Sequence, residues 1–267
     1  MSSPPARTGS VLERILSFRR QALAQAKQQT QAAKLEERAA AAQPVRDFRA
    51  ALRQNGFNII AELKKASPSR GVLREHYNPT ALAPALETAG ARALSVLTEP
   101  EFFQGDLADL QVARNLCGVP VLRKDFLFDP YQLLEARAVD ADAFLLIAAI
   151  LSPRELRQLI TLGQQLGMAA LVEVHTQEEL GAALDAGADL VGVNNRDLKT
   201  FEVNLDTSLR LIEQVPDPCV AVSESGLRSH ADLQRLRAAG FDAFLVGEHL
   251  MQAADPGVAL RRLLGGG

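Results

Sequence analysis

Eight short apolar stretches alternate with amphipathic segments from residue 57 to the end of the chain. Each apolar stretch is predicted to be a β-strand; together they cover residues 57–63, 93–99, 119–125, 143–150, 169–175, 190–195, 219–225 and 243–249. The segments between and after them have helical periodicity, at residues 79–90, 106–116, 130–140, 152–167, 176–187, 206–215, 229–240 and 255–264. Strands that alternate with helices form parallel sheets, so this pattern predicts an α/β protein.

The number of strand–helix units favours a closed barrel. The strands are nearly continuous apolar runs, as expected where both faces of a sheet are covered. An open doubly wound sheet is the alternative, but it usually carries a glycine-rich dinucleotide loop after its first strand, and KKASPSRG at residues 64–71 is not such a loop. We therefore predict a (βα)8 barrel over residues 49–267.

Residues 1–48 differ in composition from the rest of the chain. They are rich in Ala, Gln, Glu, Arg and Lys, which are good helix formers, and apolar residues such as Val11, Leu12 and Ile15 recur at helical spacing. This pattern predicts an N-terminal extension of one or two amphipathic helices packed on the barrel, and the alternative is a loosely ordered tail. Residues 1–9 are expected to fray.

Composition argues against several classes of function. The net charge is -3 and the pI is near 5.9, so no basic surface points to nucleic acid or to an anionic membrane. Cys117 and Cys219 form no CxxC pair and the four histidines are scattered, which predicts reduced thiols and no metal site. The chain has no apolar run long enough for a membrane helix and no signal-peptide core. A cytoplasmic protein is expected.

Polar residues gather at the carboxyl ends of the predicted strands, where (βα)8 barrels carry their chemistry. Side chains two residues apart share a face of a strand, so Glu62 and Lys64 point one way and Lys65 points the other. If Lys64, Lys124 and Glu173 face inward, two ammonium groups and two carboxylates meet at one mouth. Proximity and partial burial are expected to shift their pKa values toward neutrality, which suits general acid–base catalysis. A structural network of ion pairs is the alternative.

Two glycine-containing loops suggest a phosphate site. SESG lies at the carboxyl end of the seventh predicted strand and LVGEHL at that of the eighth, and barrels often bind phosphate through backbone N–H groups of the loops that follow these two strands. Ser225, Gly226 and Gly247 are the candidate residues. A glycine after a strand is weak support alone because turns use glycine freely, but here both loops have one.

Several separate motifs together resemble the indole-3-glycerol phosphate synthase family. They are IIAELKKASPSRG, LTEPEFFQG, LRKDF, LVEVH, GVNNRDLKTFEVN, SESG and FLVGEHLM, and the resemblance covers nearly the whole chain, including the extension. It implies an enzyme of tryptophan biosynthesis that cyclises, decarboxylates and dehydrates 1-(2-carboxyphenylamino)-1-deoxyribulose 5-phosphate without a metal or organic cofactor. It also implies a monomer, and it leaves weak association with other enzymes of the pathway open.

The resemblance also implies roles for individual residues. Lys124 is expected to be the general acid of ring closure and Glu173 the base of dehydration. Lys64 either donates a proton or neutralises the substrate carboxylate, and the sequence leaves both roles open. The remaining catalytic positions are expected to orient the lysines (Glu62 and Glu224) or to hydrogen-bond the reacting hydroxyl or amine (Asn194).

Further positions correspond to the two ends of the substrate. Those expected near the phosphate are Ser67, Arg196, Ser225, Gly226 and Gly247. Those expected around the anthranilate ring are Phe103, Phe126 and Leu145, and the alternative for each of these three is a place in the core. Glu248 follows Gly247 where family members often carry a hydroxyl residue. Since an acid repels phosphate, we expect backbone N–H contacts there and a Glu248 side chain that is turned away.

Three other functions are weighed against this one. A phosphate-handling isomerase barrel commonly uses Cys with Asp, but the first predicted strand does not end in cysteine. An aldolase that forms a Schiff base would use a lysine as nucleophile. A barrel kept as a binding module would show no turnover.

Overall fold

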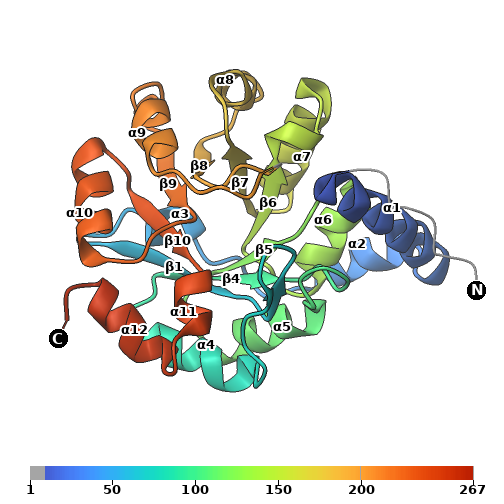
Figure 1. Cartoon of the computed structure of the whole chain (residues 1–267). Helices are drawn as coiled ribbons and strands as arrows, with labels where there is room; N and C mark the ends of the chain where they lie inside the picture. Colours follow the sequence, from blue (N-terminus) through green and yellow to red (C-terminus); the bar gives the residue numbers. More distant parts are fainter. Residues whose placement is uncertain (1–9, 199, 267) are drawn as a thin grey trace, which may run out of the picture.

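The computed structural model describes residues 10–198 and 200–266. Within these residues, parallel strands close into one eight-stranded barrel (Figure 1): β1 (Asn58–Leu63), β4 (Ala93–Leu97), β5 (Val121–Lys124), β6 (Ala143–Ile147), β7 (Ala169–Val174), β8 (Leu190–Asn194), β9 (Val220–Glu224) and β10 (Ala243–Val246). Neighbours follow chain order, and β10 pairs with β1 to close the ring. The predicted (βα)8 barrel is confirmed. The predicted fraying of residues 1–9 lies outside the described residues.

Helices surround the barrel in the order that the sequence predicts. They are α4 (Pro79–Thr88), α5 (Leu107–Leu116), α6 (Pro130–Ala138), α7 (Pro153–Gln165), α8 (Gln177–Asp185), α9 (Asp206–Ile212), α10 (His230–Ala239) and α12 (Pro256–Leu263). Local chemistry sets their starts: Ser152 caps α7 and Ser229 caps α10 in capping boxes, and Pro130 and Pro153 occupy first turns.

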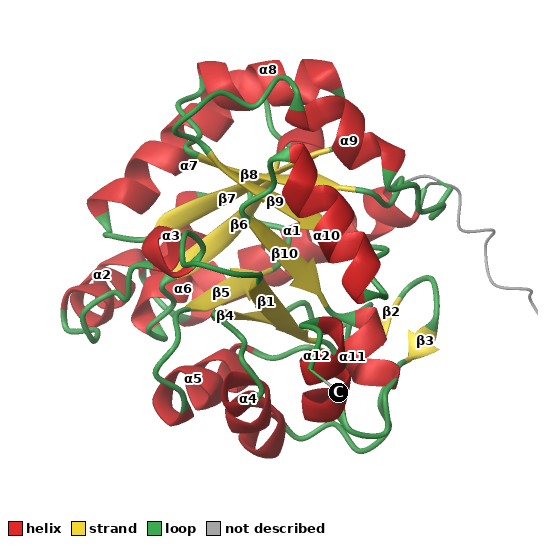
Figure 2. Cartoon of the chain, turned by 90° about the vertical axis from the view of Figure 1, so that its left-hand side faces the viewer, coloured by secondary structure: helices red, strands yellow, loops and turns green. Residues whose placement is uncertain are grey.

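Short elements at the carboxyl ends of the strands depart from the prediction. Residues 148–150, predicted as strand, form the 3-10 turn η1 (Ala148–Ile150), because pairing of β6 with β7 ends at Ile147. The last strand ends at Val246, and residues 248–252 form helix α11 (Glu248–Gln252). A hairpin of β2 (Ala66–Ser67) and β3 (Gly71–Val72) follows β1 and projects from the barrel (Figure 2).

Side-chain alternation separates two apolar layers. Ile60, Leu122, Leu171, Val222 and Leu245 fill the barrel interior, while the alternate residues of the strands pack against the surrounding helices. This follows from the period of two along each strand.

Helix α3 (Phe48–Ala51) closes the amino-terminal end of the barrel. Phe48 and Leu52 are fully buried against the interior layer. In Figure 2, α3 and the β2–β3 hairpin lie at opposite ends of the molecule. The barrel interior is therefore apolar at its amino-terminal end, and a cavity with polar residues lies at the carboxyl ends of the strands.

The N-terminal segment forms α1 (Val11–Gln29) and α2 (Ala32–Ala40), which lie beside α6 in Figure 1. Leu35 and Ala39 of α2 pack against Tyr131 and Leu134 of α6. The division at residue 48 remains a prediction, and α3 begins at that residue. Among the described residues, no helix is long and apolar enough to cross a membrane.

Candidate active site

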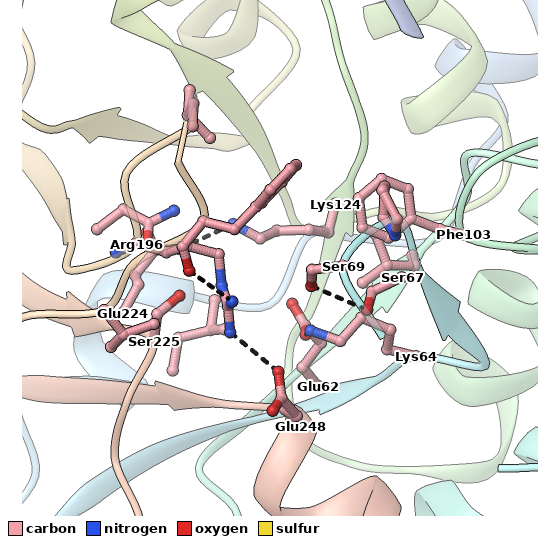
Figure 3. A pocket seen from close by; sticks show the side chains of 18 of the residues that line it. Glu62, Lys64, Ser67, Ser69, Phe103, Lys124, Arg196, Glu224, Ser225 and Glu248 are labelled. Atoms are coloured by element: carbon pink, nitrogen blue, oxygen red, sulfur yellow. Dashed lines mark hydrogen bonds and ion pairs between the residues drawn. The ribbon is translucent and has the colours of Figure 1, made fainter. Parts of the chain in front are cut away.

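The carboxyl ends of the barrel strands surround a cavity of about 480 Å³ (Figure 3). Its wall includes every residue that the sequence analysis selected for the site: Glu62, Lys64, Ser67, Phe103, Lys124, Phe126, Leu145, Glu173, Asn194, Arg196, Glu224, Ser225, Gly226 and Gly247. These residues come from all parts of the chain, so the barrel topology brings them together. Their presence in one cavity does not by itself assign a role to any of them.

Lys124 is the centre of the charged cluster at the bottom of the cavity. Its Nζ donates to Glu173 Oε2 and to Glu224 Oε2, each over 2.8 Å. Glu173 Oε1 in turn accepts a 3.0 Å hydrogen bond from Asn194 Nδ2. The three charged side chains are 12%, 3% and 1% exposed, so these interactions are largely shielded from water. One ammonium is therefore shared between two buried carboxylates.

The pKa shifts in this cluster follow from that sharing. Burial alone would lower the pKa of Lys124, but the charges of Glu173, Glu224 and Glu62 outweigh burial and raise it above its ordinary value. Burial alone would raise the pKa of Glu173, but the positive charges of Lys124 and His175 outweigh burial and lower this pKa to about 2. The expected shift toward neutrality is therefore wrong for the acid and base of the free protein, because opposite charges hold both in their charged forms.

Glu224 is the member of the cluster whose pKa shifts toward neutral pH. Burial, reinforced by the negative charge of Glu173 and opposed by Lys124, raises its pKa to about 7. The single ammonium of Lys124 cannot fully balance the charges of both Glu173 and Glu224. Glu224 is the less stabilised carboxylate of the two, so it keeps a proton up to a higher pH.

Lys64 and Lys65 lie on opposite sides of the chain, as strand alternation predicts. The Lys64 ammonium lines the cavity, 2.5 Å from Glu62 Oε1. Lys65 acts electrostatically on Asp109 of helix α5, and its backbone carbonyl accepts from the N–H of Leu73. The two adjacent lysines therefore have separate surroundings, and only Lys64 has a carboxylate partner from the cavity wall.

Two glycines make room for the carboxylates. A Cβ atom on Gly247 would lie 2.1 Å from Glu62 Oε1, and a Cβ atom on Gly192 would lie 2.0 Å from Glu224 Oε1. Gly247 was selected as a phosphate residue, and the structure gives it this additional reason. Gly192 was missed, although a glycine in the middle of strand β8 is a known sign of close approach by another group.

One side of the cavity is apolar. The rings of Phe103 and Phe126 have centroids 6.1 Å apart, and Leu145 lies in the same wall. Helix α1 contributes Val11, Leu12 and Ile15, which the sequence analysis placed on an apolar helix face but not in the site. Helical periodicity shows that a face is buried, but it does not show which surface that face covers.

A buried polar network attaches helix α1 to the strand that carries Lys124. Asp125 Oδ2 accepts hydrogen bonds from Arg19 Nη2 at 2.9 Å, Thr98 Oγ1 at 2.7 Å and Arg123 Nη2 at 3.1 Å. Arg19 belongs to α1, so the N-terminal segment is tied directly to the residue next to Lys124. The sequence shows Asp125 at a strand end but gives no sign that Arg19 is its partner.

Other parts of the cavity wall are polar. In the β2–β3 hairpin, the hydroxyl oxygens of Ser67 and Ser69 lie 3.4 Å apart. Ser225 and Gly226 after β9 both have positive φ, 68° and 84°. A non-glycine residue in this region is uncommon and such residues cluster at functional sites. These groups, with Gly247, surround a region that suits a hydrogen-bond acceptor.

Glu248 contradicts the expectation that its side chain is turned away from the site. The Glu248 side chain lines the cavity, and its Oε2 accepts a 2.9 Å hydrogen bond from Arg196 Nη2 (Figure 3). Its other oxygen, Oε1, lies 3.4 Å from Arg70 Nε. The expectation considered only repulsion by a phosphate. In the structure, two guanidinium groups attract the carboxylate into the cavity.

Comparisons with known proteins agree on one family. Residues 12–263 match the family described as indole-3-glycerol phosphate synthase. Indole-3-glycerol phosphate synthase 2 of Streptomyces coelicolor is 52% identical over 87% of this chain and 90% of the relative. The indole-3-glycerol phosphate synthase of Burkholderia vietnamiensis is 48% identical over 95% of this chain and 98% of the relative.

Solved structures with little sequence similarity share the fold. The 3-hexulose-6-phosphate synthase of Salmonella typhimurium has a TM-score of 0.63 at 13% identity, over 78% of this chain and 97% of that one. A mandelate oxidase has a TM-score of 0.59 at 17% identity, over 84% of this chain and 77% of that one. At such identities the likeness extends to the barrel alone.

Proposed function

Because the chain belongs to the indole-3-glycerol phosphate synthase family, we propose that it forms indole-3-glycerol phosphate by lysine and glutamate acid–base catalysis. The membership makes it a decarboxylating lyase of tryptophan biosynthesis. The substrate is 1-(2-carboxyphenylamino)-1-deoxyribulose 5-phosphate. The reaction closes a pyrrole ring and releases carbon dioxide and water, so it needs proton donors at two oxygen atoms and a proton acceptor at one ring position.

Lys124 is the proton donor of ring closure. An aromatic carbon attacks the ketone, and the ketone oxygen becomes an alkoxide that takes a proton from the Lys124 ammonium. The raised pKa of Lys124 ensures that this ammonium carries its proton when the substrate arrives. Loss of carbon dioxide then returns its electron pair to the ring and restores aromaticity.

Glu173 accepts the proton that is lost during dehydration. The new hydroxyl group leaves as water after it receives a proton, and Lys64 is the second cation in the cavity that can supply it. The low pKa of Glu173 keeps its carboxylate ionised in the free protein, so it carries no proton when the substrate arrives. Asn194 holds Oε1 of Glu173, which fixes the direction in which the base faces.

The shape of the cavity supports one orientation of the substrate. The anthranilate ring fits the apolar wall of Phe103, Phe126 and Leu145, and the phosphate fits the polar side near Ser67, Arg196, Ser225, Gly226 and Gly247. The reacting carbon and ketone then lie between these ends, above Lys124. Such positioning supplies part of the rate because the reacting atoms are held close together.

The observation that carries the proposal is the Lys124 ammonium between two buried carboxylates, in a cavity whose wall has both aromatic and polar groups. The test is to give the purified protein the carboxyphenylamino deoxyribulose phosphate without added metal and to follow indole fluorescence. Formation of the fluorescent product is expected. A folded protein that produces no indole signal would rule the function out.

Borohydride separates this function from that of an aldolase that uses a Schiff base. A lysine nucleophile would be trapped on a carbonyl substrate as a stable amine. Acid–base catalysis by Lys124 and Lys64 predicts no such adduct, which intact-protein mass spectrometry can check. An adduct at either lysine would overturn the acid–base assignment.

A further inference from the structure

Glu248 connects two arginines that belong to different loops at the cavity mouth. Arg70 lies between β2 and β3, Arg196 follows β8, and Glu248 follows β10. The carboxylate oxygens lie 2.9 Å from Arg196 Nη2 and 3.4 Å from Arg70 Nε. Arg196 and Glu248 are 21% and 17% exposed, so their pair is partly shielded, while Arg70 is 53% exposed.

This carboxylate occupies the position where an anion would meet a guanidinium. A phosphate and a carboxylate bind guanidinium groups through the same charge-assisted hydrogen bonds. Ser69 and Ser225 line the cavity beside the pair (Figure 3), and their hydroxyl groups can donate to a phosphate oxygen. A phosphate that approaches these donors also approaches the negative charge of Glu248, which opposes its binding.

We propose that the Glu248 carboxylate competes with the substrate's anionic group for the guanidinium of Arg196. In the free protein its carboxylate holds Arg196 and Arg70 in the cavity, and the incoming phosphate takes over Arg196. This inference rests on the proposed function, because it assumes that the polar side of the cavity receives the substrate phosphate. Glu248 thereby sets how tightly anions bind, without contacting the reacting atoms.

Replacement by Gln tests the sign of the effect. Glu248→Gln removes the competing charge, so inorganic phosphate should bind about tenfold more tightly, as judged by calorimetry and by competitive inhibition of turnover. KM for the substrate should fall as well. A residue that merely supports the loops would have the opposite effect, because its loss would weaken binding. Unchanged or weaker phosphate binding would overturn the proposal.

A matched control checks whether the loss of any surface charge has the same effect, and a second variant replaces Glu248→Gln if that protein does not fold. Glu178 is an exposed carboxylate on α8, and Glu178→Gln removes the same charge without changing the cavity. It should leave phosphate affinity within about twofold of the original. If Glu248→Gln does not fold, Glu248→Ser serves instead, with circular dichroism to show that the protein measured is folded.

A double variant distinguishes exchange of partners from simple repulsion. If the released Arg196 binds the phosphate, the gain from Glu248→Gln should largely disappear when Arg196→Gln is also present. An undiminished gain in the double variant would overturn the exchange. A wild-type protein that makes no indole would overturn the proposed function, whereas a wild-type protein that makes indole while Glu248→Gln gains no affinity would overturn the present proposal alone.

Discussion

Lys124 donates a 2.8 Å hydrogen bond to Glu173, so the proposed acid and the proposed base are joined in the free protein. The Lys124 ammonium has three N–H donors and uses two of them on Glu173 and Glu224, so the third is left for the substrate. Glu224 lies at the same distance from the Lys124 ammonium and remains as its partner when Glu173 turns to the substrate. The cluster can therefore change partners without leaving a buried ammonium unpaired, which would be costly.

The two adjacent lysines after β1 should differ sharply in importance. Lys64 faces the cavity beside Glu62, whereas Lys65 lies on the side of Asp109. Lys64→Ala should lower kcat by roughly 10²-fold, the typical scale for a lost proton donor, and Lys65→Ala should change it by less than about twofold. Steady-state kinetics of both variants checks this. Equal losses would mean that the facing of the strand is wrong.

Glu224 should make the stability of the protein depend on pH. Its pKa rises from the ordinary 4.5 to about 7, so between these values the folded protein binds a proton that the unfolded chain has released. Its contribution to the unfolding free energy is therefore complete below the lower pKa and is lost as pH rises through the upper one. A shift of this size corresponds to about 3 kcal/mol.

Urea unfolding of wild type and Glu224→Gln at several pH values measures this contribution. The difference in unfolding free energy, wild type minus variant, should decrease as pH rises from about 5 to about 7. Other groups that titrate in this range are common to both proteins and cancel in the difference. A difference that stays constant over this range would show that Glu224 is ionised throughout it, and that Lys124 neutralises the carboxylate more strongly than burial and Glu173 oppose it.

The glycine in the middle of β8 should be required for activity because of its size. A methyl group at Gly192 would meet the Glu224 carboxylate at 2.0 Å and displace it from Lys124. Gly192→Ala should therefore lower kcat by at least about tenfold, which is the effect of moving a positioned group by a fraction of an ångström. Initial-rate measurements at saturating substrate check this.

Gly181 provides the matched control for this substitution. It lies inside helix α8, and a methyl group there meets nothing within 4 Å. Gly181→Ala should leave kcat unchanged and raise stability by about 0.5–1 kcal/mol, because alanine is favoured over glycine inside helices. A fully active Gly192→Ala protein would show that Glu224 has room to move without loss.

The barrel could be predicted because every strand–helix unit repeats one pattern. Periodicity marks all eight units, and residues that can cap a helix precede several of the helices. Alternation groups Lys124 with Leu122 and Glu173 with Leu171, and the structure places both leucines in the barrel interior. Local pattern fails where tertiary contacts decide the structure. Residues 148–150 are as apolar as the strand before them and nevertheless form a turn, since no neighbouring strand pairs with them there.

The site could be predicted as a set of residues but not as a set of partners. Sequence position shows that Lys124 and Glu173 reach the same mouth, but it gives neither their mutual distance nor the resulting pKa directions. Glu248 was assigned the wrong orientation because Arg70 and Arg196 are distant in sequence and their approach depends on loop geometry. Arg19 reaches Asp125 across 106 residues for the same reason.

Replacing Arg19 should lower both the stability of the protein and its affinity for the substrate. Arg19→Met keeps the apolar stem but removes the ion pair with Asp125, which retains Thr98 and Arg123 as partners. Loss of one charge-assisted buried bond should lower the unfolding free energy by about 1–3 kcal/mol. KM should rise, because helix α1 also carries Val11 and Ile15 into the cavity wall.

Denaturant unfolding and steady-state kinetics check both effects of Arg19→Met. Lys34 is exposed on helix α2, and Lys34→Met should change the unfolding free energy by no more than about 0.5 kcal/mol. Unfolding free energies that fall equally for Arg19→Met and Lys34→Met would show that the pair with Asp125 contributes nothing specific.

The most direct test of the account is the turnover number of Lys124→Ala and Glu173→Gln with the carboxyphenylamino deoxyribulose phosphate. If these residues are the acid and the base, kcat should fall by roughly 10²-fold or more in each variant, in protein shown to be folded by circular dichroism. A rise in KM with kcat unchanged would contradict the account, because it would show that both residues only bind the substrate.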